Sequence, residues 1–236
     1  MIFADGQLNE AERGLLTSAI LDASPKPKIV LEVGTWLGGG STLHFLRALE
    51  RNAEGHLWGI EADRSIYERM VENIRTSAPE AAHRFTPLFG FSQNIIPQWL
   101  AEQGQNAVVD VVFLDGGDNP LEQITEFQLL ADRIPVGGQL LAHDAKLRKG
   151  KWLRPYMEQL DNWKVELHDV SEEGLLRAVK IEAVPSESSR RAAATMLRKL
   201  RFDPVELVGK YLPRSVCRIL LGLMPEKLRL RIGQGR

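Results

Sequence analysis

Strand-like apolar runs alternate with segments of helical period along most of the chain, and this alternation restricts the fold more than any other feature. The first run, residues 28–34, reads KIVLEVG, and residues 41–52 after it have helical spacing. Residues 108–116 read VVDVVFLDG, a nearly continuous apolar run of the kind that a strand covered on both faces requires. Repeated β-α alternation predicts a parallel sheet with helices on both faces.

The same pattern predicts the other elements of a doubly wound α/β fold. Further strands are expected at residues 56–62, 85–90 and 137–145, and helices at residues 8–22, 64–78, 92–104, 120–134 and 149–162. The last two apolar runs, residues 163–170 and 175–183, are separated by a short turn and should pair antiparallel. The predicted sheet is therefore seven-stranded and mostly parallel, with an antiparallel terminal hairpin.

The chain divides by charge into two unequal parts. Its 236 residues suffice for one α/β domain with an appendage. We assign residues 1–184 to the domain and residues 185–236 to a helical C-terminal extension. The extension carries 12 Lys and Arg against four Asp and Glu, whereas the first 184 residues have a net charge of −9. The basic extension is therefore electrostatically distinct from the domain.

Three interpretations of this extension differ in the partner that it would meet. Prolines at positions 204, 213 and 225 should divide it into short helices rich in Leu and Arg. Such helices could pack on the domain or on a second subunit of a homo-oligomer, or make peripheral contact with an anionic membrane. Nucleic acid is not expected as a partner, because Phe202 and Tyr211 are too few aromatic residues for a stacking platform.

Cysteine content and the N-terminal residues predict the compartment. Cys217 is the single cysteine, so no internal disulfide is expected and a reducing compartment is the natural setting. The first residues, MIFADGQLNEAERG, lack the basic region and apolar run of a signal peptide, and the sequence has no apolar stretch of about 18 residues. We therefore expect a cytoplasmic protein.

In a doubly wound sheet, ligands bind beyond the carboxyl ends of the strands, so the residues there are the candidates for a site. The first strand runs into EVGTWLGGGS, residues 32–41, a glycine-rich turn that would let the backbone approach a ligand. Its glycines, at 34, 38, 39 and 40, lack the spacing of a dinucleotide-binding turn. Glu61 ends the second strand, where a carboxylate would hold a ribose diol.

Four segments together resemble a known family. They are EVGTWLGGGS at residues 32–41, GIEAD at 59–63, GFSQNIIPQWL at 90–100 and VDVVFLDG at 109–116. Over about residues 29–182 the sequence resembles S-adenosylmethionine-dependent methyltransferases of the Rossmann-like class, and within it the catechol O-methyltransferase group. The resemblance implies a Rossmann-like fold, S-adenosylmethionine as cofactor and transfer of its methyl group.

The resemblance also implies which residues contact the cofactor. Ser92 and Gln93 would lie against the adenine, although Ser92 could instead cap a helix, and Glu61 would take the ribose hydroxyls. Asp115 would lie near the methyl-bearing end of the cofactor. Trp36 would either close over the cofactor or belong to the core. The turn under the methionine part would be formed by Glu32, Gly34, Thr35, Trp36, Gly38, Gly40 and Ser41, with Gly40 or Ser41 at the amino-acid carboxylate.

Two strand-end aspartates are candidate ligands of Mg²⁺. In the catechol-type enzymes an Asp, a later Asp and the Asn after it bind this ion, and Asp115 and Asp144 stand at the matching places. Residue 145 is alanine, however, and the family's lysine base is replaced by Asp118. Mg²⁺ is often bound through only one or two carboxylates plus waters. The missing third ligand therefore weakens the predicted metal site without excluding it.

Methyl transfer to oxygen requires a group that takes the hydroxyl proton. His143 is one candidate base, since histidine titrates near neutral pH, but it could instead have a structural role. Asp118 is the rival base, and Asp115 is better suited to positioning. We interpret the chain as an O-methyltransferase that acts on a hydroxyl of a small molecule, such as a phenol, a sugar or a secondary metabolite. The alternatives are a cofactor-binding module without turnover and a nucleotide-dependent oxidoreductase on the same fold.

Overall fold

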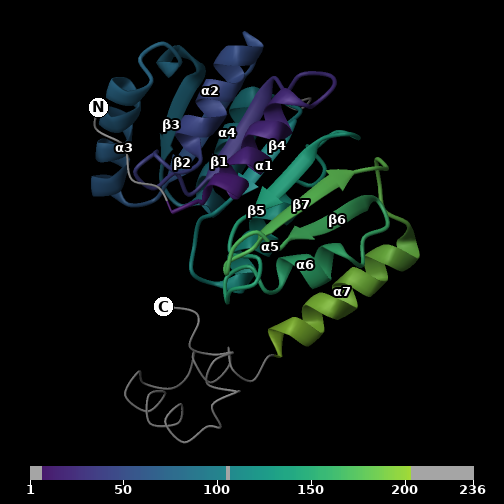
Figure 1. Cartoon of the computed structure of the whole chain (residues 1–236). Coiled ribbons are helices and arrows are strands. Elements are labelled where there is room, and N and C mark those ends of the chain that lie inside the picture. Colours follow the sequence, from purple (N-terminus) through teal and green to yellow (C-terminus); the bar gives the residue numbers. More distant parts are fainter. Residues whose placement is uncertain (1–6, 105–106, 203–236) are drawn as a thin grey trace, which may run out of the picture.

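The computed structural model describes residues 7–104 and 107–202, which form a seven-stranded sheet with helices on both faces (Figure 1). The strands are β1 (Ile29–Val33), β2 (His56–Glu61), β3 (Phe85–Phe89), β4 (Val111–Leu114), β5 (Gln139–Ala142), β6 (Trp163–His168) and β7 (Leu175–Lys180). The α-helices are α1 (Glu10–Leu21), α2 (Thr42–Asn52), α3 (Arg64–Ser77), α4 (Ser92–Gln103), α5 (Pro120–Leu130), α6 (Leu153–Met157) and α7 (Glu187–Arg201). A short 3-10 helix, η1 (Ala82–Arg84), precedes β3.

The strand order is β3-β2-β1-β4-β5-β7-β6, which is that of a doubly wound sheet. Strands β1 to β5 are parallel, and β7 lies antiparallel between β5 and β6. The predicted fold class, a Rossmann-like sheet with an antiparallel terminal hairpin, is confirmed. Strand β1 pairs with β2 on one side and with β4 on the other, so the strand order reverses here. The carboxyl ends of β1, β2 and β4 therefore meet where folds of this kind bind ligands.

Side chains of the central strands alternate between two hydrophobic cores, one on each face of the sheet. On one face, Val30 and Phe113 pack with residues of α1, α2 and α3. On the other face, Leu31 and Leu114 pack with residues of α4, α5 and α6. Because β1 and β4 are covered on both faces, their sequences are the continuous apolar runs from which they could be predicted.

Side-chain caps fix where the helices next to the strand ends begin. Asn9 and Asn119 form capping boxes with Glu12 and Glu122, so that each Asn accepts a backbone N–H and each Glu accepts the N–H of that Asn. Asp63 accepts from the first backbone N–H groups of α3. The starts of α3 and α5 are thereby held close to the ends of β2 and β4.

Helix α7 is the described part of the C-terminal extension and lies beside α6 (Figure 1). Its Ala193 is buried in the core, and Leu197 and Leu200 pack against the same core. This part of the extension therefore packs on the domain, which is one of the predicted alternatives. The helices predicted around Pro204, Pro213 and Pro225, together with Tyr211 and Cys217, lie outside the described residues. Within residues 7–104 and 107–202, no helix is both long and apolar enough to cross a membrane.

Candidate active site

A cavity of about 230 Å³ opens at the carboxyl ends of β1, β2 and β4. It is lined by five residues that the sequence analysis singled out, namely Gly34, Glu61, Ser92, Gln93 and Asp118. Three larger hollows, one along α1, one between α5 and α7 and one on α7 beside Gln159, lie away from these strand ends. The fold therefore gathers candidate residues from several separate segments around one cavity, at the place where the topology predicts a ligand.

Gly34 allows the ends of β1 and β4 to approach each other below the cavity. Its φ is +86°, and a Cβ atom at this position would lie 2.6 Å from the backbone nitrogen of Gly116. The Gly34 N–H donates to the carbonyl of Ile60, and the Asp115 N–H donates to the carbonyl of Val33. A side chain at residue 34 would push the two strand ends apart, so glycine is required here for both conformation and space.

Glu61 is held at the end of β2 by three backbone donors. Its Oε2 accepts from the N–H of Trp36 at 3.0 Å, and its Oε1 accepts from the N–H groups of Ala62 and Asp63 at 2.9 and 3.0 Å. The carboxylate also borders the cavity. Because a carboxylate has about four acceptor sites, Glu61 keeps capacity for a ligand hydroxyl while its position is fixed.

Glu32 and Ser41 lie beneath the glycine-rich turn and do not line the cavity. Glu32 is completely buried and accepts the hydroxyl hydrogen of Ser41. Burial raises the pKa of Glu32 to about 8, and the hydrogen bond from Ser41 opposes this rise only in part. The carboxyl of Glu32 is therefore largely protonated at neutral pH and links β1 to the start of α2.

The other turn residues have different surroundings. Trp36 is 50% exposed, so the alternative that placed it in the core is wrong. Its φ is +49°, which is unusual for a residue with a side chain. Thr35 is buried, and Gly38 packs against Met70 and Ile74 of α3. Neither Thr35, Gly38 nor Gly40 borders the cavity.

Ser92 contacts a buried acid, Glu126, that the sequence analysis missed. The N-cap of α4 is Phe91, so the alternative that Ser92 caps this helix is wrong. The Ser92 hydroxyl donates to Glu126 Oε1 at 2.5 Å, while Glu126 Oε2 is buried with no partner. Burial raises the pKa of Glu126 to about 7. An acidic residue on the buried side of the helix predicted at 120–134 is the signal that could have found it.

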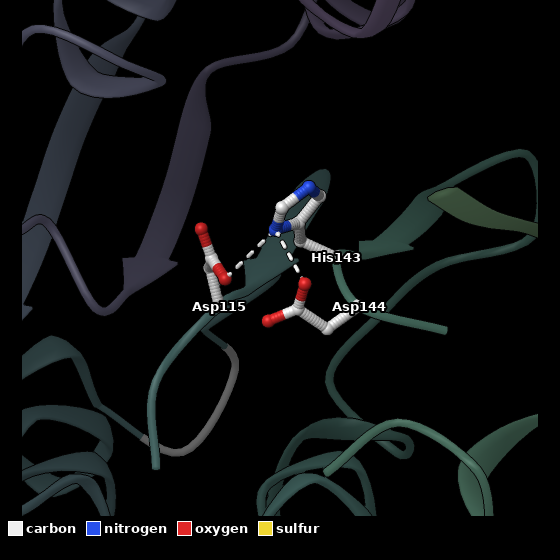
Figure 2. A group of neighbouring side chains, drawn as sticks. All are labelled: Asp115, His143 and Asp144. Atoms are coloured by element: carbon white, nitrogen blue, oxygen red, sulfur yellow. Dashed lines mark hydrogen bonds and ion pairs between the residues drawn. The ribbon is translucent and has the colours of Figure 1, made fainter. Parts of the chain in front are cut away.

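His143 lies between carboxylates at the end of β5 (Figure 2). Its Nδ1 is 3.3 Å from Oδ1 of Asp115 and 3.3 Å from Oδ1 of Asp144, and its Nε2 is 3.3 Å from Oε1 of Glu12. Burial lowers the pKa of His143, but Asp115, Asp144 and Glu12 outweigh burial and raise the pKa to about 9. His143 therefore keeps its proton at neutral pH. These contacts favour its structural role over its role as base.

Lys149 completes this cluster and was not singled out in the sequence. Its Nζ is 2.8 Å from Asp115 Oδ1, 2.8 Å from Asp144 Oδ2 and 2.9 Å from the Asp115 carbonyl oxygen. Burial alone would raise the pKa of Asp115, but His143 and Lys149 hold it below its usual value. Lys149 follows Asp115 by 34 residues in an irregular loop, so no spacing rule connects the two.

The cluster contains the residue types of a metal site, but some of the oxygen atoms that would bind a metal already contact Lys149. Ligand atoms of Asp115, His143 and Asp144 all lie within 4.8 Å of one another. The Lys149 ammonium, however, already contacts one oxygen of each aspartate. Ala145, which stands in place of the third ligand of the catechol-type enzymes, is buried and has no side-chain oxygen. As they lie, these residues do not fit a bound Mg²⁺ ion.

Comparison with known proteins agrees with this topology. Residues 31–145 match a family model described as a methyltransferase domain. A similar fold is found in a candidate caffeoyl-CoA O-methyltransferase of Staphylococcus aureus, with 15% identity, a TM-score of 0.60 and coverage of 74% of this chain and 85% of that one. An O-methyltransferase of Bacillus cereus in complex with SAH has 18% identity and a TM-score of 0.55, covering 74% and 82%. An SAH-bound methyltransferase of Podospora anserina has 15% identity and a TM-score of 0.58, covering 75% and 80%. None of the curated proteins matches the sequence.

Proposed function

We propose that this chain, whose residues 31–145 match the model of a methyltransferase domain and which has a Rossmann-like fold, transfers a methyl group from S-adenosylmethionine to a hydroxyl group of a small molecule. The observation that carries the proposal is the cavity at the ends of β1, β2 and β4, which gathers Glu61, Ser92 and Gln93. Solved methyltransferases that share the fold, two of them with SAH bound, support this reading.

The lining of the cavity fits the adenosine part of this cofactor. Glu61 is fixed where its remaining acceptor site would take a ribose hydroxyl, and Ser92 and Gln93 border the side on which we place the adenine. The unpartnered Oε2 of Glu126 is a buried acceptor in the same wall, and the amino group of adenine would satisfy it. We therefore add Glu126 to the proposed cofactor-binding residues.

The glycine-rich turn would hold the methionine part. Gly34 borders the cavity, and Glu32 and Ser41 would support the turn from below rather than contact the cofactor directly. Exposed Trp36 would close over the bound cofactor. When bound, S-adenosylmethionine supplies an electrophilic methyl group on a sulfonium centre, and the protein's task is to align a hydroxyl oxygen with it.

Asp118 is the proton acceptor that we propose. It lines the cavity and is exposed, whereas His143 is buried and already protonated. Asp115 belongs to the charged cluster and does not itself line the cavity, but it directly precedes Gly116, which does, and from there it would orient the acceptor hydroxyl. The carboxylate of Asp118 would take the hydroxyl proton as the oxygen attacks the methyl carbon.

The proposed activity is tested by binding and by turnover. Calorimetry should show binding of S-adenosylhomocysteine and no binding of NAD. Incubation of labelled S-adenosylmethionine with a panel of phenols, sugars and other hydroxyl compounds should give a labelled product. Asp118→Asn should lower kcat by about 10²-fold, the lower range for loss of a general base, with the S-adenosylhomocysteine affinity unchanged.

Each alternative reading has its own outcome in this experiment. Binding of S-adenosylhomocysteine with no product from any acceptor would favour the cofactor-binding module without turnover. Binding of NAD in its place would favour the oxidoreductase. An Asp118→Asn variant with normal kcat would show that another group takes the proton.

We also propose that residues 1–184 are the catalytic domain and residues 185–236 a basic extension that contacts a second subunit or an anionic membrane surface. The supporting observations are the charge of the extension and the exposed basic residues of α7. The packing of α7 beside α6 ties the start of the extension to the domain.

A further inference from the structure

The buried ammonium of Lys149 is fully satisfied by the site that surrounds it. An ammonium group has three N–H donors, and three acceptors lie within 2.9 Å of Nζ: Asp115 Oδ1, the Asp115 carbonyl oxygen and Asp144 Oδ2. The side chain is only 16% exposed. Lys149 is therefore a fixed part of the site rather than a surface lysine that meets an acid by chance.

The loop that carries Lys149 is closely fitted to the end of β5. Asp144 has a φ of +57°, which turns the chain out of the strand, and its carbonyl accepts the N–H of Leu147 at 2.9 Å. At Gly150 the returning chain comes so near that a Cβ atom would lie 2.3 Å from the Asp144 carbonyl oxygen. The N–H groups of the two residues after Asp144, Ala145 and Lys146, donate to backbone carbonyls of the loop between β6 and β7. The path of the backbone thus brings Lys149 back next to Asp115 and Asp144.

A divalent ion and Lys149 would compete for the same oxygen atoms. Asp115 and Asp144 offer the carboxylates that Mg²⁺ would need, and the ammonium contacts one oxygen of each. The Asp115 oxygen that Lys149 contacts, Oδ1, also faces His143, and the same ring nitrogen of His143 faces Asp144 (Figure 2). The other ring nitrogen of His143 faces Glu12. An ion at this place would bring two further positive charges into the space that the ammonium fills, so the lysine would have to leave first.

We propose that Lys149 is the resident cation of this site and takes the place of a divalent metal. It neutralises Asp115 and Asp144 and holds their carboxylates in one orientation just beyond the ends of β4 and β5. Lys149 is thus a positioning residue, because all its donors are used within the protein. The inference deepens the proposed function and rests on it for the role of the site in methyl transfer, which would proceed without a metal.

The proposal is tested by measuring whether the protein binds Mn²⁺. Electron paramagnetic resonance reports the concentration of the free ion, which falls when Mn²⁺ is bound. The wild-type protein should leave the Mn²⁺ signal unchanged at protein concentrations of about 100 μM. Lys149→Ala should bind one Mn²⁺ at least tenfold more tightly than the wild type, because two carboxylates lose their cation. The double variant Lys149→Ala with Asp115→Asn should lose that binding. Lys146→Gln is the matched control, since Lys146 lies in the same loop but pairs with Asp169, and it should behave as the wild type.

Two results would overturn the proposal. One is binding of one Mn²⁺ by the wild-type protein that Asp115→Asn abolishes. The other is a Lys149→Ala variant, folded by circular dichroism, that gains no Mn²⁺ binding; Lys149→Gln replaces it if the alanine variant does not fold. These measurements do not require a methyl-acceptor substrate, and the wild-type protein can be measured whether or not the variants fold. Failure of the proposed function would appear separately, as absence of S-adenosylhomocysteine binding in buffer with or without EDTA.

Discussion

Glu126 offers the most direct test of cofactor recognition by a single residue. If its buried Oε2 accepts from the adenine amino group while Oε1 accepts from Ser92, Glu126→Gln keeps an acceptor oxygen at only one of these two positions, so the two donors can no longer both be satisfied as before. We expect the dissociation constant of S-adenosylhomocysteine to rise about tenfold, which corresponds to about 1.4 kcal/mol. Titration calorimetry measures the change, with Glu158→Gln at the C-cap of α6 as control. Equal affinities of the wild type and Glu126→Gln would remove Glu126 from the adenine site.

Glu32 should make the stability of the ligand-free protein depend on pH. Burial raises its pKa from 4.5 to about 8, so between these values the folded protein binds more protons than the unfolded chain does. The free energy of unfolding should therefore fall as pH rises from about 4.5 to 8. Glu32→Gln removes this proton and should flatten the profile. Urea unfolding at pH 5, 6.5 and 8 measures it, and an unchanged slope in Glu32→Gln would contradict the assignment.

Residues of the site differ in how far the sequence could predict them. Glu61 and Asp115 could be found because each ends an apolar run, and parallel strands align their carboxyl ends. Lys149 could not, because its partners are set by the return of a loop in space. Glu126 falls between these cases, since the helical pattern marks its burial but not its partner, Ser92.

At the scale of elements, the junction of β1 with β4 should be sensitive to one added carbon atom. Gly34→Ala would place Cβ 2.6 Å from the Gly116 nitrogen at a φ of +86°. We expect a loss of about 2 kcal/mol or more in the free energy of unfolding and loss of measurable S-adenosylhomocysteine binding. Gly14→Ala in α1, where nothing lies within 4 Å, should instead stabilise the protein by about 0.5–1 kcal/mol. Chemical unfolding compares the two variants, and equal effects of both would contradict this account of Gly34.

The elements themselves were largely predictable, for a physical reason. Strands β1 and β4 are buried on both faces, so each is a continuous apolar run that stands out from its polar ends. The sequence could not assign the strand order, because the pairing of β1 with both β2 and β4 depends on contacts between distant segments. The predicted helix at 149–162 is shorter in the structure, with α6 limited to Leu153–Met157, because the residues before it form the loop that carries Lys149.

For the whole molecule, the opposite charges of the domain and the extension predict that the two parts have different roles. Truncation of the extension tests this. Removal of residues 185–236 takes away α7, whose Ala193, Leu197 and Leu200 cover part of the core, so the melting temperature should fall by several degrees. Removal of residues 203–236 keeps α7 and should leave the melting temperature nearly unchanged. The cavity is formed at the ends of β1, β2 and β4, away from the extension. We therefore expect neither truncation to change the affinity for S-adenosylhomocysteine by more than about twofold, which is less than about 0.5 kcal/mol.

The longer of these truncations also tests what the extension contacts. It carries eight more positive than negative charges, whereas the domain carries a net −9, so binding to anionic vesicles should depend on the extension and weaken as salt is added. Removal of residues 185–236 should lower either the fraction bound to anionic vesicles or the apparent mass in size-exclusion chromatography. The first result would favour a membrane surface and the second a second subunit. If both quantities are unchanged while cofactor affinity falls, the extension belongs to the catalytic domain, and the boundary at residue 184 is wrong.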